Sequence, residues 1–341
     1  MSKKNVLNVK NMNVSFKSHG QEVKAVRGVS FSVDQGEIVG LVGESGSGKS
    51  VTMKAVMGIL PDNAERTAES ILLNERELKD LSDEECRKVR GKEMTMIFQD
   101  PMTALNPLKK IGSQIEEVII RQKKCSKNEA KEKALEMLKK VGIPNPEVRL
   151  GQYPHEFSGG MRQRVLIAMA LACEPELLIA DEPTTALDVT IQAQILDLLH
   201  ELKDEFHTSI MLITHDMGVV ATVCSKVIIM YGGLVMESGT VEEVFYEPKH
   251  PYTKALLKAI PSLDLKEGER LQSIPGLPPS LIDPPKGCPF AARCEYCMDV
   301  CEQLPPEAYT VADDHTTFCW LQHEMAPETD LKKATAKKGE V

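Results

Sequence analysis

The chain contains the stretch Gly43-Glu44-Ser45-Gly46-Ser47-Gly48-Lys49-Ser50. It follows an apolar run at residues 37–42 and precedes residues 51–57, which have a helical composition. This strand–loop–helix order is the context that a phosphate-binding P-loop requires. Glycines let successive backbone N–H groups turn toward one anion, and the helix N-terminus adds positive potential. The stretch therefore predicts a nucleotide site in an α/β protein built on a P-loop sheet.

Two side chains of this loop have expected chemical roles. Lys49 is placed to reach the terminal phosphates, and the Ser50 hydroxyl is placed to bind Mg²⁺. The alternative is a glycine-rich turn that contains a lysine by chance, and the flanking strand and helix argue against it. The loop residues expected to bind nucleotide are Gly43, Ser45, Gly46, Gly48, Lys49, Ser50 and Val51.

Charge and hydropathy exclude several classes of protein. The 341 residues carry a formal net charge of −9, which argues against a broad nucleic-acid-binding surface and against purely electrostatic attachment to an anionic membrane. The N-terminal residues lack the apolar run of a signal peptide. The longest apolar run, residues 165–173, is too short to span a bilayer and predicts a buried helix. If this protein works at a membrane, other chains must supply the spans.

The pattern along the chain predicts two kinds of structure. Residues 5–42 alternate apolar and polar positions, which favours a small antiparallel β region. Residues from about 100 to 165 are helical in character, with 130–138 the clearest amphipathic stretch. Buried strands separated by a helix around 191–203 then predict a parallel sheet covered on both faces. These strands are residues 177–180, 210–213 and 227–230.

A second motif stands at the end of the first of these strands, where Asp181 and Glu182 are adjacent. Acids at a strand end are often only solvated. In a chain with a P-loop they look like a Walker B motif, in which Asp181 would hold Mg²⁺ through its second shell. Glu182 would polarise the attacking water as general base, a role worth about 10²–10⁴ in rate.

A third motif, Phe157-Ser158-Gly159-Gly160-Met161-Arg162-Gln163-Arg164, precedes the apolar helix. Ser158 is a good N-cap, and the two glycines leave backbone N–H groups open to an anion. Alone, this stretch predicts a capped helix start. Together with the other two motifs it resembles the signature sequence of the ABC ATPases.

The resemblance to ABC ATPases covers most of residues 1–245. It implies that Gln99 is the Q-loop residue and a Mg²⁺ ligand, and that Asp188 belongs to the D-loop, Ala186-Leu187-Asp188. It also implies that His215 is the switch histidine and that Phe16 stacks on adenine. The catalytic set would be Glu182, His215 and Gln99. One departure is Met161, which stands where the family usually has glutamine.

The resemblance further implies a head-to-tail dimer. Each ATP would lie between one chain's P-loop and the signature residues Ser158, Gly159 and Gly160 of the other chain. Closure would complete the coordination of the γ-phosphate, and hydrolysis would reopen the dimer. Residues 100–107 would connect this motion to a membrane partner.

Residues 100–107, 184–190 and 248–253 resemble the oligopeptide and dipeptide importer subfamily, most closely its D-type ATPase subunit. Such a subunit pairs with a related ATPase at the cytoplasmic face of the membrane. It lies beneath two membrane permeases. An extracytoplasmic peptide-binding protein delivers peptide to these permeases. Nickel and glutathione importers belong to the same subfamily, so the expectation of a peptide cargo depends on the resemblance alone. The alternative class is a soluble ABC ATPase of DNA repair or translation, and the single P-loop and acidic balance argue against it.

Five cysteines fall between residues 288 and 319, and in a reducing compartment such a cluster favours metal binding over disulfides. The resemblance points to Cys288, Cys294, Cys301 and Cys319 as ligands of a 4Fe–4S cluster, with Cys297 spare. The alternatives are zinc, for which His315 could replace one thiolate, and no metal at all. The expected domains are an ABC ATPase domain at 1–247, with a helical subdomain at about 100–165. An extension and proline-rich linker would follow at 248–287, then a cysteine-rich module at 288–324 and a disordered tail at 325–341.

Overall fold

The computed structural model describes residues 4–18, 20–185, 187–260 and 274–333. The chain divides into two compact units, each assembled from separate stretches of sequence. The first unit comprises Met1–Leu7, Val33–Ile38 and Leu72–Ile213, and the second comprises Asn8–Ser32, Val39–Ile71 and Thr214–Val341.

The first unit contains a parallel run of strands in the order β9-β8-β7. Ile179 of β8 stands beside Met96 of β7 and Met211 of β9. Every residue of β8 and β9 is buried, because parallel strands covered on both faces carry continuous apolar sequence. The predicted parallel sheet is thus present here. The strands are β7 (Met94–Ile97), β8 (Leu177–Asp181) and β9 (Ser209–Thr214).

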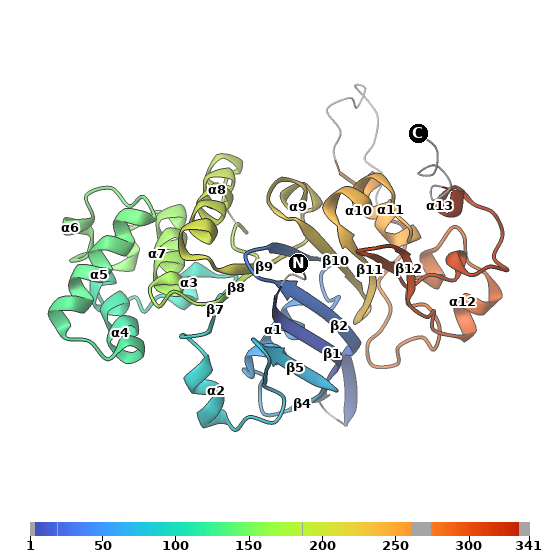
Figure 1. The fold of residues 1–341 in the computed structure, drawn as a ribbon, viewed down its shortest axis with the longest axis horizontal. Coiled ribbons are helices and arrows are strands. Elements are labelled where there is room, and N and C mark those ends of the chain that lie inside the picture. The colour runs from blue at the N-terminus through green and yellow to red at the C-terminus, as the bar shows by residue number, and fades with distance from the viewer. Residues whose placement is uncertain (1–3, 19, 186, 261–273, 334–341) are drawn as a thin grey trace. The chain divides into compact units, whose positions relative to one another are not determined.

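Helices α4 to α7 form the helical part of the same unit (Figure 1). A capping box of Ser126 and Glu129 starts α5, which buries Ala130, Ala134 and Leu138 along one face. The predicted amphipathic helix at 130–138 is therefore confirmed. The helices are α2 (Asp83–Val89), α3 (Pro101–Ala104), α4 (Ile111–Lys123), α5 (Lys127–Lys140), α6 (Pro146–Arg149), α7 (Gly159–Leu171) and α8 (Val189–Phe206), with a 3₁₀ turn η1 (Pro154–Glu156).

The second unit contains the strand order β12-β13-β11-β10-β3. β10 runs parallel to β3, with Ile228 beside Leu41, and antiparallel to β11. The short strand β13 then pairs antiparallel with β11, so residues of the C-terminal region extend this sheet. The strands are β3 (Ile38–Val42), β10 (Lys226–Tyr231), β11 (Leu234–Thr240), β12 (Tyr309–Ala312) and β13 (His315–Thr317).

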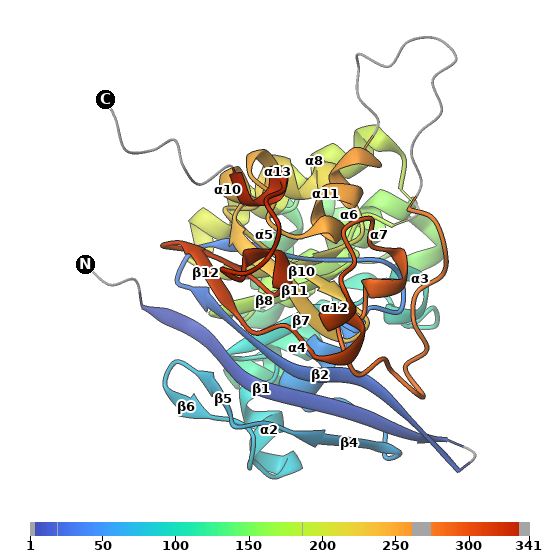
Figure 2. The same cartoon turned by 90° about the vertical axis from the view of Figure 1, so that its right-hand side faces the viewer.

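Two long strands, β1 (Asn5–Ser18) and β2 (Gln21–Asp34), lie side by side in Figure 2. β1 and β2 are hydrogen-bonded neighbours, which confirms a β region within residues 5–42, and β1 also pairs antiparallel with β4. The shorter strands nearby are β4 (Ala64–Thr67), β5 (Ser70–Leu73) and β6 (Arg76–Glu77). The helices of the second unit are α1 (Lys49–Met57), α9 (Met217–Val223), α10 (Val241–Tyr246), α11 (Pro251–Lys258), α12 (Asp299–Gln303) and α13 (Asp330–Lys333), with 3₁₀ turns η2 (Ala291–Arg293) and η3 (Trp320–Gln322).

An aromatic cluster of Tyr231, Tyr252 and Phe290 joins β10, α11 and the start of η2 inside the second unit. Their ring centroids lie 4.6 to 5.5 Å apart, within the range of favourable aromatic packing. All three side chains are buried. The C-terminal region therefore packs against β10. This strand pairs with β3, and the P-loop begins where β3 ends.

The structure describes only part of the predicted C-terminal tail and of the predicted linker. Within the predicted tail at 325–341, Asp330–Lys333 form α13, and Leu331 is buried; residues 334–341 lie outside the described residues. In the predicted linker, residues 261–273 likewise lie outside them. In the described part of the chain, no helix combines the length and hydropathy needed to cross a membrane.

Candidate nucleotide-binding site

The P-loop connects the end of β3 to the start of α1 in the second unit. At Gly43 a Cβ atom would lie 2.1 Å from the carbonyl oxygen of Met230, and at Gly48 it would lie 2.5 Å from that of Ala25. Gly48 also has a φ of 101°, which favours glycine. The sequence requirement for glycine at these two positions is therefore steric as well as conformational, and it lets the loop backbone pass close to its neighbours.

Lys49 is the first residue of α1, and only 6% of its surface is exposed. Its Nζ donates to the carbonyl oxygens of Gly43 at 2.7 Å and Glu44 at 3.0 Å, and lies 3.4 Å from Ser47 Oγ. The ammonium group is thus held under the loop, at the N-terminal end of a helix. This is the arrangement that lets a lysine and backbone N–H groups face one polyanion.

Phe16 and His215 belong to the same unit as the P-loop. Phe16 is half-buried on β1, opposite Ala64 of β4. His215 is exposed and directly follows the buried Thr214 at the end of β9. The next residue, Asp216, caps α9 by accepting hydrogen bonds from Gly218 N and Val219 N.

In the first unit, the two acids predicted as Walker B stand at the carboxyl end of β8. Asp181 is its last residue and is 3% exposed. Glu182 follows with a φ of 47°, a left-handed conformation that is uncommon for a non-glycine residue. Its backbone N–H donates to Ile213 O at 2.9 Å, which holds this turn against the end of β9. Strained residues of this kind cluster at functional sites.

The Glu182 carboxylate is oriented by two side chains of the same unit. Gln99 Nε2 donates to Glu182 Oε2 at 2.9 Å, and Thr185 Oγ1 donates to the same oxygen at 2.8 Å. The structure therefore brings together two residues that the sequence placed in one catalytic set. Thr185 was not predicted to be part of this set.

The signature residues form the exposed N-terminus of α7. Ser158 is its N-cap, and its Oγ accepts from Met161 N at 3.3 Å. This bond uses only the backbone of residue 161, so methionine in place of glutamine leaves the cap intact. A Cβ on Gly160 would lie 2.6 Å from Ile191 in α8, which explains glycine there. In the predicted D-loop, Asp188 caps α8 by accepting from Ile191 N, while Ala186 lies outside the described residues.

The P-loop also contacts the C-terminal region, through side-chain contacts that no sequence motif predicts. Arg293 Nη1 donates to Glu44 Oε2 at 2.8 Å, and Glu44 N donates to Tyr252 OH at 3.0 Å. Arg293 and Glu44 are separated by 249 positions in the chain. No local pattern marks either residue, so this contact could be found only in three dimensions.

The prediction of a 4Fe–4S cluster or zinc at Cys288, Cys294, Cys301 and Cys319 is wrong. The described residues include all five C-terminal cysteines, yet among them no three or more histidine, cysteine, aspartate or glutamate side chains are placed to hold a metal ion.

These four cysteines instead contribute to apolar packing. Cys288 and Cys301 belong to the core around Phe290, with Cys294 packed against it, and Cys319 lies with Leu321 and Leu331. Burial raises the pKa of Cys288 to about 12 and that of Cys294 to about 11. The neutral thiol is therefore favoured, and a buried neutral thiol behaves as a small apolar side chain.

The chain matches two protein-family models and several solved structures. The family model described as "ABC transporter" matches residues 26–185, and "Oligopeptide/dipeptide transporter, C-terminal region" matches residues 236–301. Among solved structures, the dimeric ATP-binding cassette MJ0796, bound to ADP and Pi, is 29% identical. It aligns with a TM-score of 0.62 over 69% of this chain and 98% of that chain. The matches define an ABC-type nucleotide-binding domain, as the three motifs predicted.

Full-length relatives extend this result. The dipeptide transport ATP-binding protein DppD of Bacillus subtilis (strain 168) is 55% identical, over 96% of this chain and 97% of that protein. The oligopeptide transport ATP-binding protein OppD of Escherichia coli (strain K12) is 54% identical, over 88% of this chain and 89% of that protein. The chain therefore belongs to the oligopeptide/dipeptide transport ATP-binding proteins of the ABC family, which confirms the resemblance seen in the sequence.

Proposed function

We propose that this chain is the ATP-hydrolysing subunit of an ABC importer that drives uptake of dipeptides and oligopeptides through separate membrane permeases. The observation that carries the ATPase part is the Glu182 carboxylate, held by Gln99 and Thr185 at the end of β8. The peptide part is supported by the relatives, of which several are named for dipeptide or oligopeptide transport.

Each motif residue has a proposed role in binding and hydrolysing ATP. Lys49 binds the terminal phosphates, with loop N–H groups from Gly43 to Val51, and Phe16 packs on adenine. Ser50 and Gln99 would hold Mg²⁺ directly, and Asp181 would act through a bound water. Mg²⁺ supplies charge neutralisation at the phosphates. Supporting this assignment, Lys49 is buried beneath a loop whose glycines permit close backbone approach.

Glu182 is the proposed general base, and His215 the proposed residue that senses the γ-phosphate. A base must be oriented before water attacks, and the hydrogen bonds from Gln99 and Thr185 serve that purpose. Gln99 has two roles in this proposal. It orients Glu182 through a hydrogen bond, and after that bond breaks it would bind Mg²⁺. His215 is exposed and stands directly after β9.

The proposed assembly contains two ATPase chains and two permeases, with a peptide-binding protein acting outside the membrane. Ser158, Gly159 and Gly160 would contact the ATP of the partner ATPase, which we propose is a related, distinct chain. The signature loop is exposed, as such a role requires. Near the Q-loop in the sequence, Phe98 and Leu108 are 42% and 86% exposed, and we propose that these apolar side chains contact a permease at the cytoplasmic face of the membrane.

We also propose the domain division predicted from the sequence, with the ATPase domain at 1–247 and a C-terminal region that includes a cysteine-rich module at 288–324. The match of residues 236–301 to a separate C-terminal family model supports a distinct C-terminal region, although the bounds of that match differ from the predicted ones. The pairing of β13 with β11 ties this region to the sheet of the ATPase domain.

Uptake into proteoliposomes tests the proposed function. The chain would be co-purified with its permeases and related ATPase, reconstituted, and supplied with peptide-binding protein and radiolabelled dipeptide or oligopeptide. Peptide uptake that requires ATP supports the proposal. ATP-dependent uptake of nickel or glutathione, without uptake of the labelled peptides, would show that nickel or glutathione is the cargo instead. Retention on nucleic acid at moderate salt, with no association with permeases, would place the chain in the soluble class instead.

A further inference from the structure

Glu44, the second residue of the P-loop, is held through all three of its polar groups. Its backbone N–H donates to Tyr252 OH at 3.0 Å, and its carbonyl accepts from Lys49 Nζ at 3.0 Å. Its carboxylate accepts from Arg293 Nη1 at 2.8 Å. One loop residue therefore links the phosphate-binding lysine to two side chains of the C-terminal region.

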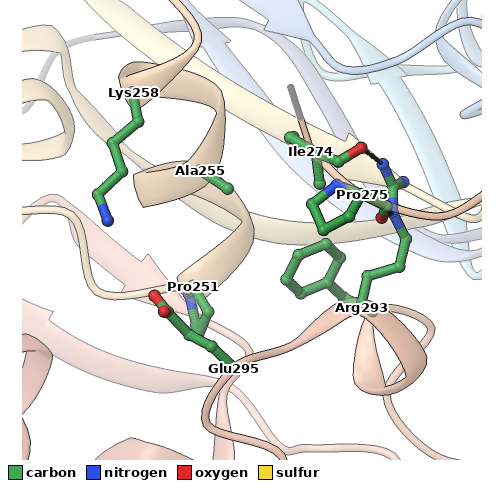
Figure 3. Close-up of a pocket in the computed structure, with 8 residues that line it drawn as sticks. Pro251, Ala255, Lys258, Ile274, Pro275, Arg293 and Glu295 are labelled. Atoms are coloured by element: carbon green, nitrogen blue, oxygen red, sulfur yellow. Dashed lines mark hydrogen bonds between the residues drawn. The ribbon is translucent and has the colours of Figure 1, made fainter. Parts of the chain in front are cut away.

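The Arg293 guanidinium is itself fixed at several points. Nη1 also donates to Tyr231 OH at 2.9 Å, Nε donates to Pro275 O at 2.8 Å, and Nη2 donates to Ile274 O at 3.1 Å. Figure 3 shows the bond to Ile274. The guanidinium lies 5.9 Å from the Phe290 ring, close enough for a cation–π contact. Only 6% of the side chain is exposed, and 23% of Glu44.

A charge-assisted pair with this burial is stronger than a surface ion pair, because water screens it less. One side of Arg293 borders a cavity of about 170 Å³, also lined by Pro251 and Ala255 (Figure 3). The guanidinium is therefore kept in place by its hydrogen bonds more than by close packing on that side. Removing the bond from Arg293 Nη1 releases the Glu44 carboxylate.

We propose that Arg293 is a positioning residue, which acts through Glu44 to hold the P-loop and Lys49 in the geometry that binds nucleotide. The C-terminal region thereby sets the affinity of the ATP site. This inference rests on the proposed function, since it requires that the P-loop binds ATP.

A double-mutant cycle on ATP affinity tests the inference. The dissociation constant of a fluorescent ATP analogue would be measured for the full chain, for Arg293→Gln, for Glu44→Gln and for the double variant. Each single variant is expected to bind about tenfold more weakly, the change expected for one charge-assisted hydrogen bond. The double variant is expected to bind within twofold of either single variant, because both changes break the same link.

Two controls separate positioning from general damage. Tyr231→Phe removes another acceptor of Arg293 but leaves Glu44 bound, so its affinity is expected to stay within twofold of the wild type. In steady-state hydrolysis, Arg293→Gln is expected to raise KM about tenfold with kcat within twofold. The melting temperature without nucleotide is recorded for every variant.

The inference is overturned if Glu44→Gln binds the analogue as tightly as the wild type. It is equally overturned if the two single effects multiply in the double variant, since Arg293 would then act by another route. Where Arg293→Gln does not fold, Glu44→Gln and Arg293→Lys decide the question, with Arg293→Lys expected to lie between Arg293→Gln and the wild type. Wild-type protein that binds no better than Lys49→Ala would instead contradict the proposed function.

Discussion

Gln99 Nε2 lies 2.9 Å from Glu182 Oε2, so the Q-loop amide donates directly to the carboxylate that stands after β8. Glu182 holds this position with a φ of 47°, and Thr185 donates to the same oxygen. A strained backbone and two donors thus fix one carboxylate. Several contacts that hold one side chain are typical of a catalytic group, which must be oriented before the reaction begins.

Replacing Glu182 by glutamine keeps the shape of the side chain and its ability to accept a hydrogen bond but removes the base. ATP binding is expected to be unchanged, while kcat falls about 10²- to 10⁴-fold. Nucleotide binding and steady-state hydrolysis are measured on the same preparation. Turnover at the wild-type rate would remove Glu182 from the role of general base.

Gln99→Ala removes a donor that orients the Glu182 carboxylate. Because the carboxylate keeps its bond from Thr185, we expect a smaller loss in kcat than for Glu182→Gln, about tenfold. Thr185→Val provides the matched test of the other donor. If both variants hydrolyse ATP at the wild-type rate, these hydrogen bonds do not orient the base.

Lys49→Ala removes the ammonium group beneath the P-loop. The lost charge-assisted contacts are worth about 1.5–3 kcal/mol, which corresponds to about 10- to 150-fold weaker ATP binding. Isothermal titration with ATP and Mg²⁺ measures the change. Lys54→Ala, on the same helix, is the control for loss of a positive charge. Equal affinities for wild type and Lys49→Ala would contradict the P-loop assignment.

Gly48→Ala would force a Cβ atom to within 2.5 Å of Ala25 O at a φ of 101°. The left-handed conformation alone costs about 1–2 kcal/mol, and the overlap adds to this. Gly36→Ala is the control, since Gly36 has a φ of 72° and no heavy atom lies within 4 Å of the added Cβ. Chemical denaturation should show a larger loss of stability for Gly48→Ala. Equal losses of stability would mean that the backbone near Ala25 shifts to accommodate the added Cβ atom at no measurable cost.

His250 should make the stability of the folded chain depend on pH. It caps α11 by accepting from Tyr252 N at Nδ1, and burial lowers its pKa from 6.5 to about 3. Between these values the unfolded chain binds the proton and the folded chain does not. Stability is therefore lost as pH falls below about 6.5, by at most about 1.4 kcal/mol per pH unit from this group.

His250→Asn keeps an acceptor at the helix N-cap but cannot titrate in this range. Urea denaturation of wild type and variant at pH 7.5 and pH 5 measures the difference. The drop in unfolding free energy between the two pH values should be smaller in the variant. Equal drops would show that His250 is protonated in the folded chain or does not contribute.

The local motifs could be predicted from the sequence because each depends on neighbouring residues. The P-loop needs glycines beside a strand and a helix, and Glu182 follows a continuous apolar strand. The helix containing residues 130–138 carries its own apolar face, and its capping box involves residues only three positions apart.

Features that depend on distant residues could not be predicted in this way. β12 and β13 are four and three residues long, too short for a readable alternation, and become strands by pairing with each other and with β11. The contact of Arg293 with Glu44 has no local signal. For the cysteines, spacing along the chain suggested a metal site, whereas the folded positions of Cys288, Cys301 and Cys319 assign them to apolar packing.

Steady-state ATP hydrolysis by this chain, assembled with its permeases and related ATPase and measured with and without peptide-loaded binding protein, tests the account most directly. We expect hydrolysis that rises when peptide-loaded binding protein is added and that is abolished when Glu182→Gln is introduced into this chain. Hydrolysis that ignores peptide, or that continues unchanged with Glu182→Gln, would contradict the claim that this chain powers peptide import.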